Sequence, residues 1–421
     1  MSQKSHKKEE IVDPFIGKII FNKYQIIKKI GEGCFGFIYK AKSLNSNKLY
    51  AIKFEDMREG QYILEEEAIF LCSINCKRIP KVKSFGYSGF YLILVMQLLG
   101  KSLDKILNEL PSKKMSLRCA CNIAYQLITI FEIIHNNDII HRDIKPANIA
   151  IGYEDKYKFL YVLDFGLSKK YRIGHSKKHL PFTKNNQLIG NARYSSINAL
   201  EGGTQSRRDD LESIGYLILY LILGKLPWQG KVSHSKDDKY YKIREIKKQT
   251  TPEELCKGLP KQFEDYVKYT RNLEYEANPD YNYLRNLFLS TLKSYNWELD
   301  YYYDWDQTTL SNNEINNKIC SNLYDNIKVP KLYSKIVELK SERKLYGGDF
   351  EIERFVFDIE EESTFNIYKK KSIRNENEIE YDYSNSMKPY SPYPRTKVKH
   401  RGCMPCQPKD YKDDDGCCLI F

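Results

Sequence analysis

The chain has 421 residues, and its 67 Lys and Arg exceed its 55 Asp and Glu, which gives a net charge of +12. This length suits a two-lobed domain with extensions. The basic excess favours acidic or phosphorylated substrates or an anionic membrane surface, and without zinc-finger spacings or RNA-binding motifs no nucleic-acid partner is expected. The polar start excludes a secretory signal, and eleven cysteines without one indicate reduced thiols in the cytosol.

The first predicted elements are a charged, mobile extension over residues 1–23 and then short strands at residues 24–27, 37–41 and 49–54. A glycine-rich stretch, Gly31-x-Gly33-x-x-Gly36, lies between the first two strands. Glycines there let backbone amides approach phosphates and permit a tight turn. A flexible hairpin or a dinucleotide fingerprint would share this pattern, but a strand rather than a helix follows it, which argues against the dinucleotide site.

Lys53 ends an apolar strand and would point its ammonium at the phosphates, although a lone lysine at a strand end is usually solvated. Residues 62–74 have a helical period and carry Glu65-Glu66-Glu67. We assign Glu66 as the partner of Lys53, because apolar residues follow it at the spacing that packs such a helix. A solvated acidic face is the alternative for all three, and the register is defined only to within one residue.

A buried strand and its connector are predicted at residues 91–100. Backbone groups at Gln97 to Leu99 would contact an adenine edge, with Met96 at the back of the pocket. Helices are predicted at residues 102–110 and 117–135.

The most informative stretch runs from His141 to Gly166, with His141-Arg142-Asp143, Asn148 and Asp164-Phe165-Gly166 in that order. Two acidic residues and an amide on adjacent loops suit a site that holds magnesium and a nucleotide. Asp143 can align a substrate hydroxyl, while Asn148 and Asp164 offer oxygen ligands to the metal. The alternative is a helix–strand connection with surface charges.

Together these motifs resemble, in full order, those of the eukaryotic protein kinases. More narrowly, the chain resembles the casein kinase 1 family of serine/threonine kinases. The narrower resemblance rests on stretches that include Gly190-Asn191-Ala192-Arg193-Tyr194-Ser195-Ser196-Ile197-Asn198, Arg207-Arg208-Asp209-Asp210-Leu211-Glu212-Ser213, Leu226-Pro227-Trp228-Gln229-Gly230 and Pro279-Asp280-Tyr281-Asn282-Tyr283-Leu284-Arg285. It implies an α+β, two-lobed kinase fold over residues 24–306, with a β-rich lobe at 24–96 and a helical lobe at 100–306. The composition of the tail at 307–421 predicts that it is mostly disordered.

The resemblance also implies roles for single residues. Lys53 would bind the α- and β-phosphates of ATP and Glu66 would position it. Asp143 would be the catalytic aspartate, Lys145 a charge at the transferred phosphoryl group, and Asn148 and Asp164 the Mg²⁺ ligands. Asp210 would be a buried anchor of the catalytic loop. The nucleotide site would comprise Ile30, Gly31, Glu32, Gly33, Gly36, Ile38, Ala51, Lys53, Met96, Gln97, Leu99 and Asp164.

Substrate choice is predicted to depend on basic residues near the cleft. Members of this family receive an acidic or phosphorylated residue upstream of the target serine, and Arg142, Lys169 and Arg193 match three positions of that anion pocket. A further family lysine aligns with Val232, beside Lys231, and this departure weakens the expected phosphate preference. A solvated basic face is the alternative.

Beyond residue 306 the composition shifts. A helix docked on the large lobe is expected from the spacing of Val329, Leu332, Ile336 and Leu339, and disorder is expected after Tyr368. The last four residues, Cys418-Leu419-Ile420-Phe421, match a prenylation motif that favours geranylgeranylation of Cys418. Candidates for palmitoylation are Cys417, Cys403 and Cys406. A Cys403-x-x-Cys406 metal site is disfavoured because no second ligand pair lies near.

We therefore expect a monomeric serine/threonine kinase that acts on acidic or pre-phosphorylated sites of proteins. Its lipidated tail, with nearby basic residues, would supply the two signals that stable attachment to the cytosolic face of a membrane requires. The alternative is a pseudokinase scaffold that binds partners through the basic loop and tail. The presence of Lys53, Asp143, Asn148 and Asp164 argues against that alternative.

Overall fold

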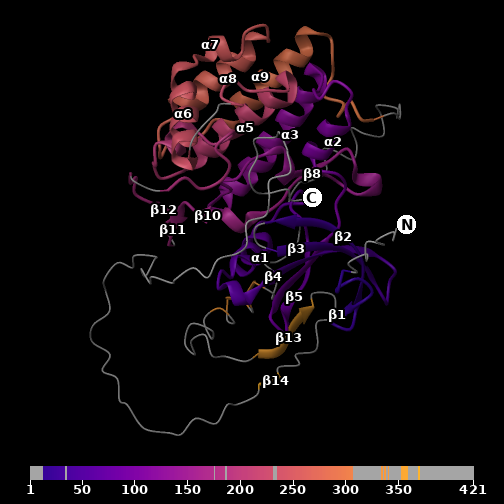
Figure 1. Ribbon diagram of the computed structural model, residues 1–421. Coiled ribbons are helices and arrows are strands. Elements are labelled where there is room, and N and C mark those ends of the chain that lie inside the picture. The colour runs from indigo at the N-terminus through magenta and orange to yellow at the C-terminus, as the bar shows by residue number, and fades with distance from the viewer. Residues whose placement is uncertain are drawn as a thin grey trace, which may run out of the picture.

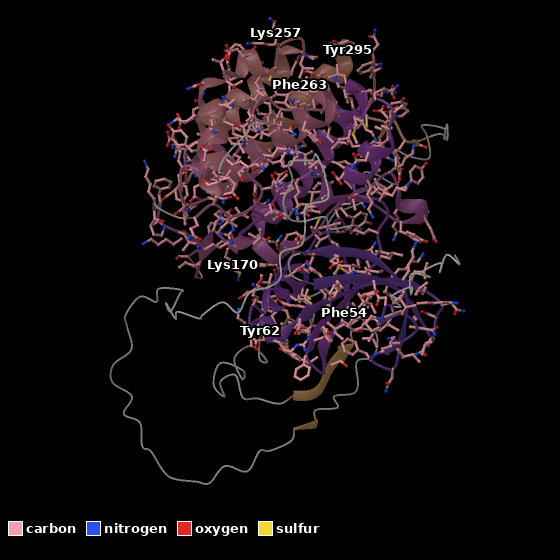
Figure 2. The ribbon with its side chains drawn as sticks, in the orientation of Figure 1. Phe54, Tyr62, Lys170, Lys257, Phe263 and Tyr295 are labelled. Atoms are coloured by element: carbon pink, nitrogen blue, oxygen red, sulfur yellow. The ribbon has the colours of Figure 1, made fainter. Side chains whose placement is uncertain are left out.

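The computed structural model has two lobes, a small one built on a curled sheet and a large helical one (Figure 1). It describes residues 13–33, 36–174, 176–184, 187–230, 235–306, 333–334, 336–337, 340, 352–358 and 368–369. Figure 2 shows buried aromatic rings in both lobes, with Phe54 in the small lobe and Phe263 in the large lobe. The predicted two-lobed α+β fold is confirmed.

The small lobe is an antiparallel sheet in which strands β2 to β6 follow the chain closely and three other strands extend its edges. Alternation along β6 shows how the sheet is packed: Ile93 and Val95 face one hydrophobic cluster, and Leu92 and Leu94 face the other. The spatial order is β1 (Ile19–Ile20), β2 (Tyr24–Gly33), β3 (Gly36–Ser43), β4 (Leu49–Asp56), β6 (Tyr91–Gln97), β5 (Val82–Ser88), β13 (Ile352–Asp358) and β14 (Tyr368–Lys369).

Residues 13–23 are folded onto the sheet, which differs from the mobile extension expected there. The Phe15 ring packs on Phe54 at 5.0 Å and on Tyr91 at 5.2 Å between centroids. The Tyr39 hydroxyl donates to the Asp13 carboxylate at 2.9 Å. The physical reason is the aromatic outer face of the sheet, which offers Phe15 a place out of water.

One helix of the small lobe, α1 (Ile63–Ser73), packs between the sheet and the large lobe and confirms the helix predicted at residues 62–74. A 3₁₀ turn, η1 (Met57–Glu59), connects β4 to it. The Glu55 carboxylate, from β4, accepts hydrogen bonds from the backbone N–H of Ile63 at 2.7 Å and of Leu64 at 2.8 Å. Glu55 therefore serves as the N-terminal cap of α1 and ties it to β4.

The large lobe is built around α3 (Leu117–Asn136), which packs against α5 (Arg207–Leu223) and α9 (Tyr281–Ser294). Helix α3 is long and apolar enough to cross a membrane, but 72% of its apolar window is buried within the protein, as expected for a core helix. Its N-terminus is capped by Ser116, whose hydroxyl accepts from Cys119 N–H at 3.2 Å.

Shorter elements complete the large lobe. The further helices are α2 (Leu103–Glu109), α4 (Ile197–Leu200), α6 (Lys236–Gln249), α7 (Pro252–Leu255) and α8 (Lys261–Asn272), with 3₁₀ turns η2 (Pro146–Asn148), η3 (Glu154–Lys156) and η4 (Phe165–Leu167). Two-residue or three-residue strands form the pairs β7 (Ile139–Ile140) with β10 (Lys169–Lys170), β8 (Ile149–Ile151) with β9 (Leu160–Val162), and β11 (Arg172–Ile173) with β12 (Lys178–His179). The first two pairs flank the segments that carry Asp143, Asn148 and Asp164.

The described part of the C-terminal segment lies on the small lobe. Residues 333, 334, 336, 337 and 340 are helical, as predicted around Ile336. Lys340 forms an ion pair with Glu66 of α1, which belongs to the small lobe and not to the large lobe on which docking was expected. Strand β13 pairs with β5 and β14 with β13, at the edge of the sheet (Figure 1). Val329, Leu332, Leu339 and the predicted lipidation cysteines lie outside the described residues.

Candidate active site

The predicted catalytic loop follows β7 and is anchored by one buried carboxylate. Asp210 on α5 accepts hydrogen bonds from the backbone N–H of His141 at 2.8 Å and of Arg142 at 2.9 Å. Arg142 has a φ of 69°, a conformation that a non-glycine residue holds only when its surroundings impose it. The role predicted for Asp210 is therefore confirmed.

His135 completes this anchor from α3. Its Nε2 lies 3.0 Å from the Asp210 carboxylate and its Nδ1 lies 2.7 Å from the Tyr281 hydroxyl. Burial lowers the pKa of His135, although Asp210 acts in the opposite direction. A neutral imidazole fits both contacts, with Nε2–H donating to Asp210 and Nδ1 accepting from Tyr281. Despite its burial, Asp210 has a lowered pKa because His135 and the loop N–H groups stabilise its charge.

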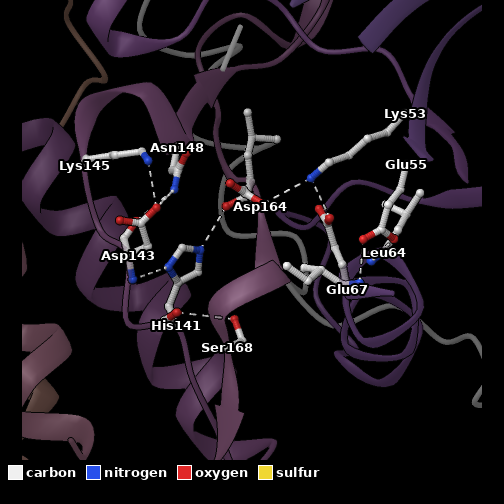
Figure 3. Close-up of polar contacts among 12 residues, drawn as sticks. Lys53, Glu55, Leu64, Glu67, His141, Asp143, Lys145, Asn148, Asp164 and Ser168 are labelled. Atoms are coloured by element: carbon white, nitrogen blue, oxygen red, sulfur yellow. Dashed lines mark hydrogen bonds and ion pairs between the residues drawn. The ribbon is translucent and has the colours of Figure 1, made fainter. Parts of the chain in front are cut away.

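Asp143, Lys145 and Asn148 meet at one point of this loop (Figure 3). The Lys145 ammonium lies 2.8 Å from Asp143 Oδ2, and the Asn148 side-chain amide donates to the same oxygen at 3.0 Å. The other side-chain atom of Asn148, Oδ1, is buried and has no hydrogen-bond partner among the described residues. An unpaired buried oxygen is unfavourable unless a cation or donor takes it. Asn148 therefore fits the predicted metal ligand.

The second acidic loop is held against the first. His141 Nε2 donates to the Leu163 carbonyl at 2.9 Å, and its ring meets the Phe165 ring edge-on at 5.0 Å between centroids. Asp164 has a φ of 61°, again in the left-handed region. A side chain at Gly166 would lie 2.9 Å from the Ile63 side chain of α1, so it would have to displace that side chain. The loop thus brings the Asp164 carboxylate to the small lobe.

Lys53 lies buried between two carboxylates, those of Glu67 and Asp164 (Figure 3). Its Nζ is 2.7 Å from Glu67 Oε2 and 3.2 Å from Asp164 Oδ1. Burial alone would lower the pKa of Lys53, but Asp164 and Glu67 outweigh it and the pKa is raised. Burial likewise opposes ionisation of Asp164, yet Lys53 and Lys145 lower its pKa. Lys53 and Asp164 are therefore both charged, as the binding of phosphate and metal requires.

The assignment of Glu66 as the partner of Lys53 is wrong by one residue. Successive helical residues point about 100° apart, so three consecutive glutamates face three directions. Glu65 accepts from the Tyr87 hydroxyl on β5, Glu66 pairs with Lys340, and Glu67 pairs with Lys53. The alternative, a solvated acidic face, is also wrong for this triplet, because each carboxylate has a separate partner.

Most of the predicted nucleotide-binding residues in the small-lobe strands lie on one face of the sheet, whereas Glu32 and Gln97 lie on the other. Ile38 pairs with both Gly31 and Lys53, and Ala51 pairs with Met96, so these residues line neighbouring strands. Residues two apart on a strand share a face, which places Ala51 on the side of Lys53. Gly36 has a φ of 137°, and a side chain there would lie 1.7 Å from the Phe54 carbonyl oxygen. Residues 34–35 lie outside the described part of the chain.

Two of the three predicted anion-pocket residues lie close together. Burial lowers the pKa of Arg142 to about 10. Burial also lowers the pKa of Lys169, and the charge of Arg142 adds to this effect. Arg193 lies three residues after Gly190. A side chain at Gly190 would lie 2.2 Å from the Arg142 carbonyl oxygen, so the two segments pass close to each other. Residues 231–234, which include Lys231 and Val232, lie outside the described part.

A lysine that the sequence did not single out holds the segment around Arg193. Lys247 on α6 is fully buried and donates to the carbonyls of Ala192 at 3.0 Å and Ser195 at 2.6 Å. The Trp228 indole N–H donates to the Arg193 carbonyl at 2.8 Å. Burial lowers the pKa of Lys247. One lysine in a basic helix gives no sequence signal for such a role.

The fold and this arrangement define an enzyme that transfers phosphoryl groups. A small lobe supplies a paired lysine, and a large lobe supplies an aspartate, an asparagine and a second aspartate. The family model of the protein kinase domain matches residues 24–277, which is more than half of the chain. The chain belongs to the protein kinase family. Its class of reaction is therefore ATP-dependent phosphoryl transfer to protein substrates.

Proposed function

We propose that this protein is an active serine/threonine kinase, similar to casein kinase 1 enzymes, that phosphorylates acidic or already phosphorylated sites. The observation that carries the proposal is that the Arg142 guanidinium donates to the carbonyls of Leu167 at 2.7 Å and of Ser168 at 3.3 Å, the residue before Lys169. Two cations this close repel one another, and an anion between them relieves that repulsion. Lys170 adds charge at the edge of the large lobe that faces the small lobe (Figure 2).

The residues divide the catalytic work between them. Asp143 is placed to orient a substrate hydroxyl and take its proton, while Lys145 beside it stabilises charge on the transferred phosphoryl group. Lys53 would contact the nucleotide phosphates. Asn148 and Asp164 supply two oxygens, which suits Mg²⁺ because that ion binds few protein ligands and keeps phosphate and water ligands. When bound, the metal neutralises phosphate charge.

A peptide pair tests the substrate class. Both peptides carry the same target serine, and one has a phosphoserine upstream. We expect kcat/KM to be at least about tenfold higher for the primed peptide, which corresponds to about 1.4 kcal/mol. Lys169→Ala should reduce that ratio and leave the rate on the unprimed peptide within about twofold. Equal rates on the two peptides would remove the acidic-site proposal.

A casein assay distinguishes the active kinase from the alternative, a scaffold without activity. The intact Lys53–Glu67 and Asp143–Asn148 contacts support the enzyme. Wild-type protein should label casein from ATP, and Asp164→Asn should not. Labelling by both proteins, or by neither, contradicts the enzyme proposal.

We further propose that Cys418 is prenylated and that neighbouring tail cysteines are acylated, so that the kinase works at a membrane. The support is the C-terminal motif and the basic residues before it. Cys418→Ser should move the protein from the membrane fraction to the soluble fraction. Unchanged partitioning would exclude the prenyl anchor.

A further inference from the structure

Helix α1 carries the residue on which Lys53 depends, so its position decides whether the nucleotide site is complete. Three of its attachments come from the kinase domain itself. Glu55 caps its N-terminus, Glu65 accepts from Tyr87, and Glu67 pairs with Lys53. The remaining glutamate, Glu66, is paired with Lys340, which lies beyond the matched kinase domain.

The C-terminal segment contributes a buried apolar side chain as well as the ion pair. Ile336 is 1% exposed and belongs to the same hydrophobic cluster as Ile69 and Phe70 of α1. Because residues four apart share one face of a helix, Ile336 and Lys340 point to the same side, and so do Glu66 and Phe70. Ile336 is therefore buried on the same side of its helix as Lys340, whose ammonium reaches Glu66 of α1.

The same segment supports α1 a second time through the sheet. Strand β13 pairs with β5 over five positions, including Phe355 opposite Tyr87 and Val356 opposite Gly86. Tyr87 is the residue whose hydroxyl donates to Glu65 of α1. In Figure 1, β13 lies beside β5 on the side of the small lobe far from the large lobe. The segment thus contacts α1 directly through Lys340, and its strand β13 pairs with β5, the strand that carries Tyr87.

We propose that Ile336, Lys340 and strand β13 together position α1: by holding this helix they keep Glu67 on Lys53, and their release lowers catalysis. The positioning residues are Ile336 and Lys340, which act through Glu67 and do not touch substrate. The proposal rests on the chain being a kinase, and it is independent of the acidic-site preference and of lipidation.

The relative weight of the two contacts follows from their burial. The Lys340–Glu66 pair is partly exposed, with side chains 25% and 44% accessible, and such pairs contribute little. Ile336 is buried, and an ionised side chain there would have to leave the cluster. Ile336→Asp should therefore release the segment, whereas Lys340→Glu should weaken it.

The test compares two variants of the full-length protein that add the same charge to the same helix. Ile336→Asp alters the buried position and Ser334→Asp alters an exposed one. We expect Ile336→Asp to speed hydrogen exchange in residues 63–73 and to weaken ATP binding. It should lower kcat/KM for ATP about tenfold, which is within the range of typical coupling between two sites. The KM for casein should be unchanged, and Ser334→Asp should match wild type in all four measurements.

A charge swap gives a second test that does not depend on a core substitution. Lys340→Glu should lower kcat/KM for ATP about threefold. Adding Glu66→Lys to it should restore the rate, because the pair is re-formed with reversed sign. If Ile336→Asp unfolds the protein, this charge swap alone decides whether the segment positions α1.

Two outcomes overturn the proposal. Unchanged exchange in residues 63–73 of a folded Ile336→Asp protein means that the segment does not hold α1. Faster exchange with unchanged ATP binding and rate means that the contact has no bearing on Lys53. If wild-type protein lacks kinase activity, exchange and ATP binding still answer this question, and only the proposed enzyme function fails.

Discussion

In the large lobe, Asp143 and Asn148 lie five residues apart on a loop whose backbone is anchored by one buried carboxylate, Asp210. In the small lobe, Lys53 depends on Glu67, which comes from a separate helix. The first half is fixed by covalent proximity and backbone hydrogen bonds. The second half depends on how α1 is placed, so it can be changed without unfolding the domain.

The largest expected effect comes from breaking the anchor of the large lobe. Asp210→Ala leaves two buried backbone N–H groups and His135 without their acceptor. Each such group costs about 1–3 kcal/mol, so the free energy of unfolding should fall by about 3 kcal/mol or more, measured by urea denaturation. Asp210→Asn keeps one acceptor oxygen and should lose less. Equal stability of wild type and Asp210→Ala would contradict the anchoring role.

An intermediate effect is expected in the small lobe, on activity rather than on stability. Glu67→Gln removes the charge that pairs with Lys53 and should lower kcat/KM for ATP about 10-fold to 100-fold. Glu66→Gln is the matched control, because its pair with Lys340 is partly exposed and its loss should stay within about threefold. Similar losses for the two variants would show that the Lys53 partner is not Glu67 alone.

The smallest effect concerns pH. Burial lowers the pKa of His135 below its ordinary 6.5, so the unfolded chain binds a proton more readily than the folded one. The stability that neutral His135 supports is therefore present above about pH 6.5 and declines as pH falls, by at most about 1.4 kcal/mol per pH unit. His135→Gln should show a smaller loss between about pH 7.5 and about pH 5.5 in thermal unfolding. A steeper loss in the variant would contradict this assignment.

The sequence predicted the large-lobe half of the site because its residues stand in short, contiguous motifs. Asp143, Asn148 and Asp164 needed no knowledge of how distant elements pack. Glu67 needed a helix register that three consecutive glutamates do not define. Lys247 was missed because its burial results from the packing of α6 on the segment that carries Arg193.

For the same reason, the sequence did not predict where the two terminal segments pack. Residues 352–358 read Ile-Glu-Arg-Phe-Val-Phe-Asp, a run rich in β-branched and aromatic residues that favours a strand. Its partner, β5, lies more than 250 residues earlier in the chain, and no local pattern names that partner. Phe15 likewise gave no sign that it would join the aromatic face of the sheet.

The pairing of β13 with β5 has a practical consequence for how the protein is handled. An exposed strand edge presents unpaired N–H and C=O groups to other chains and promotes aggregation. The matched kinase domain ends at residue 277, and a fragment cut near there keeps β5 but lacks β13. Such a fragment would carry an open edge along Ser84 to Ser88 and should be less soluble than the full chain, even with every catalytic residue in place.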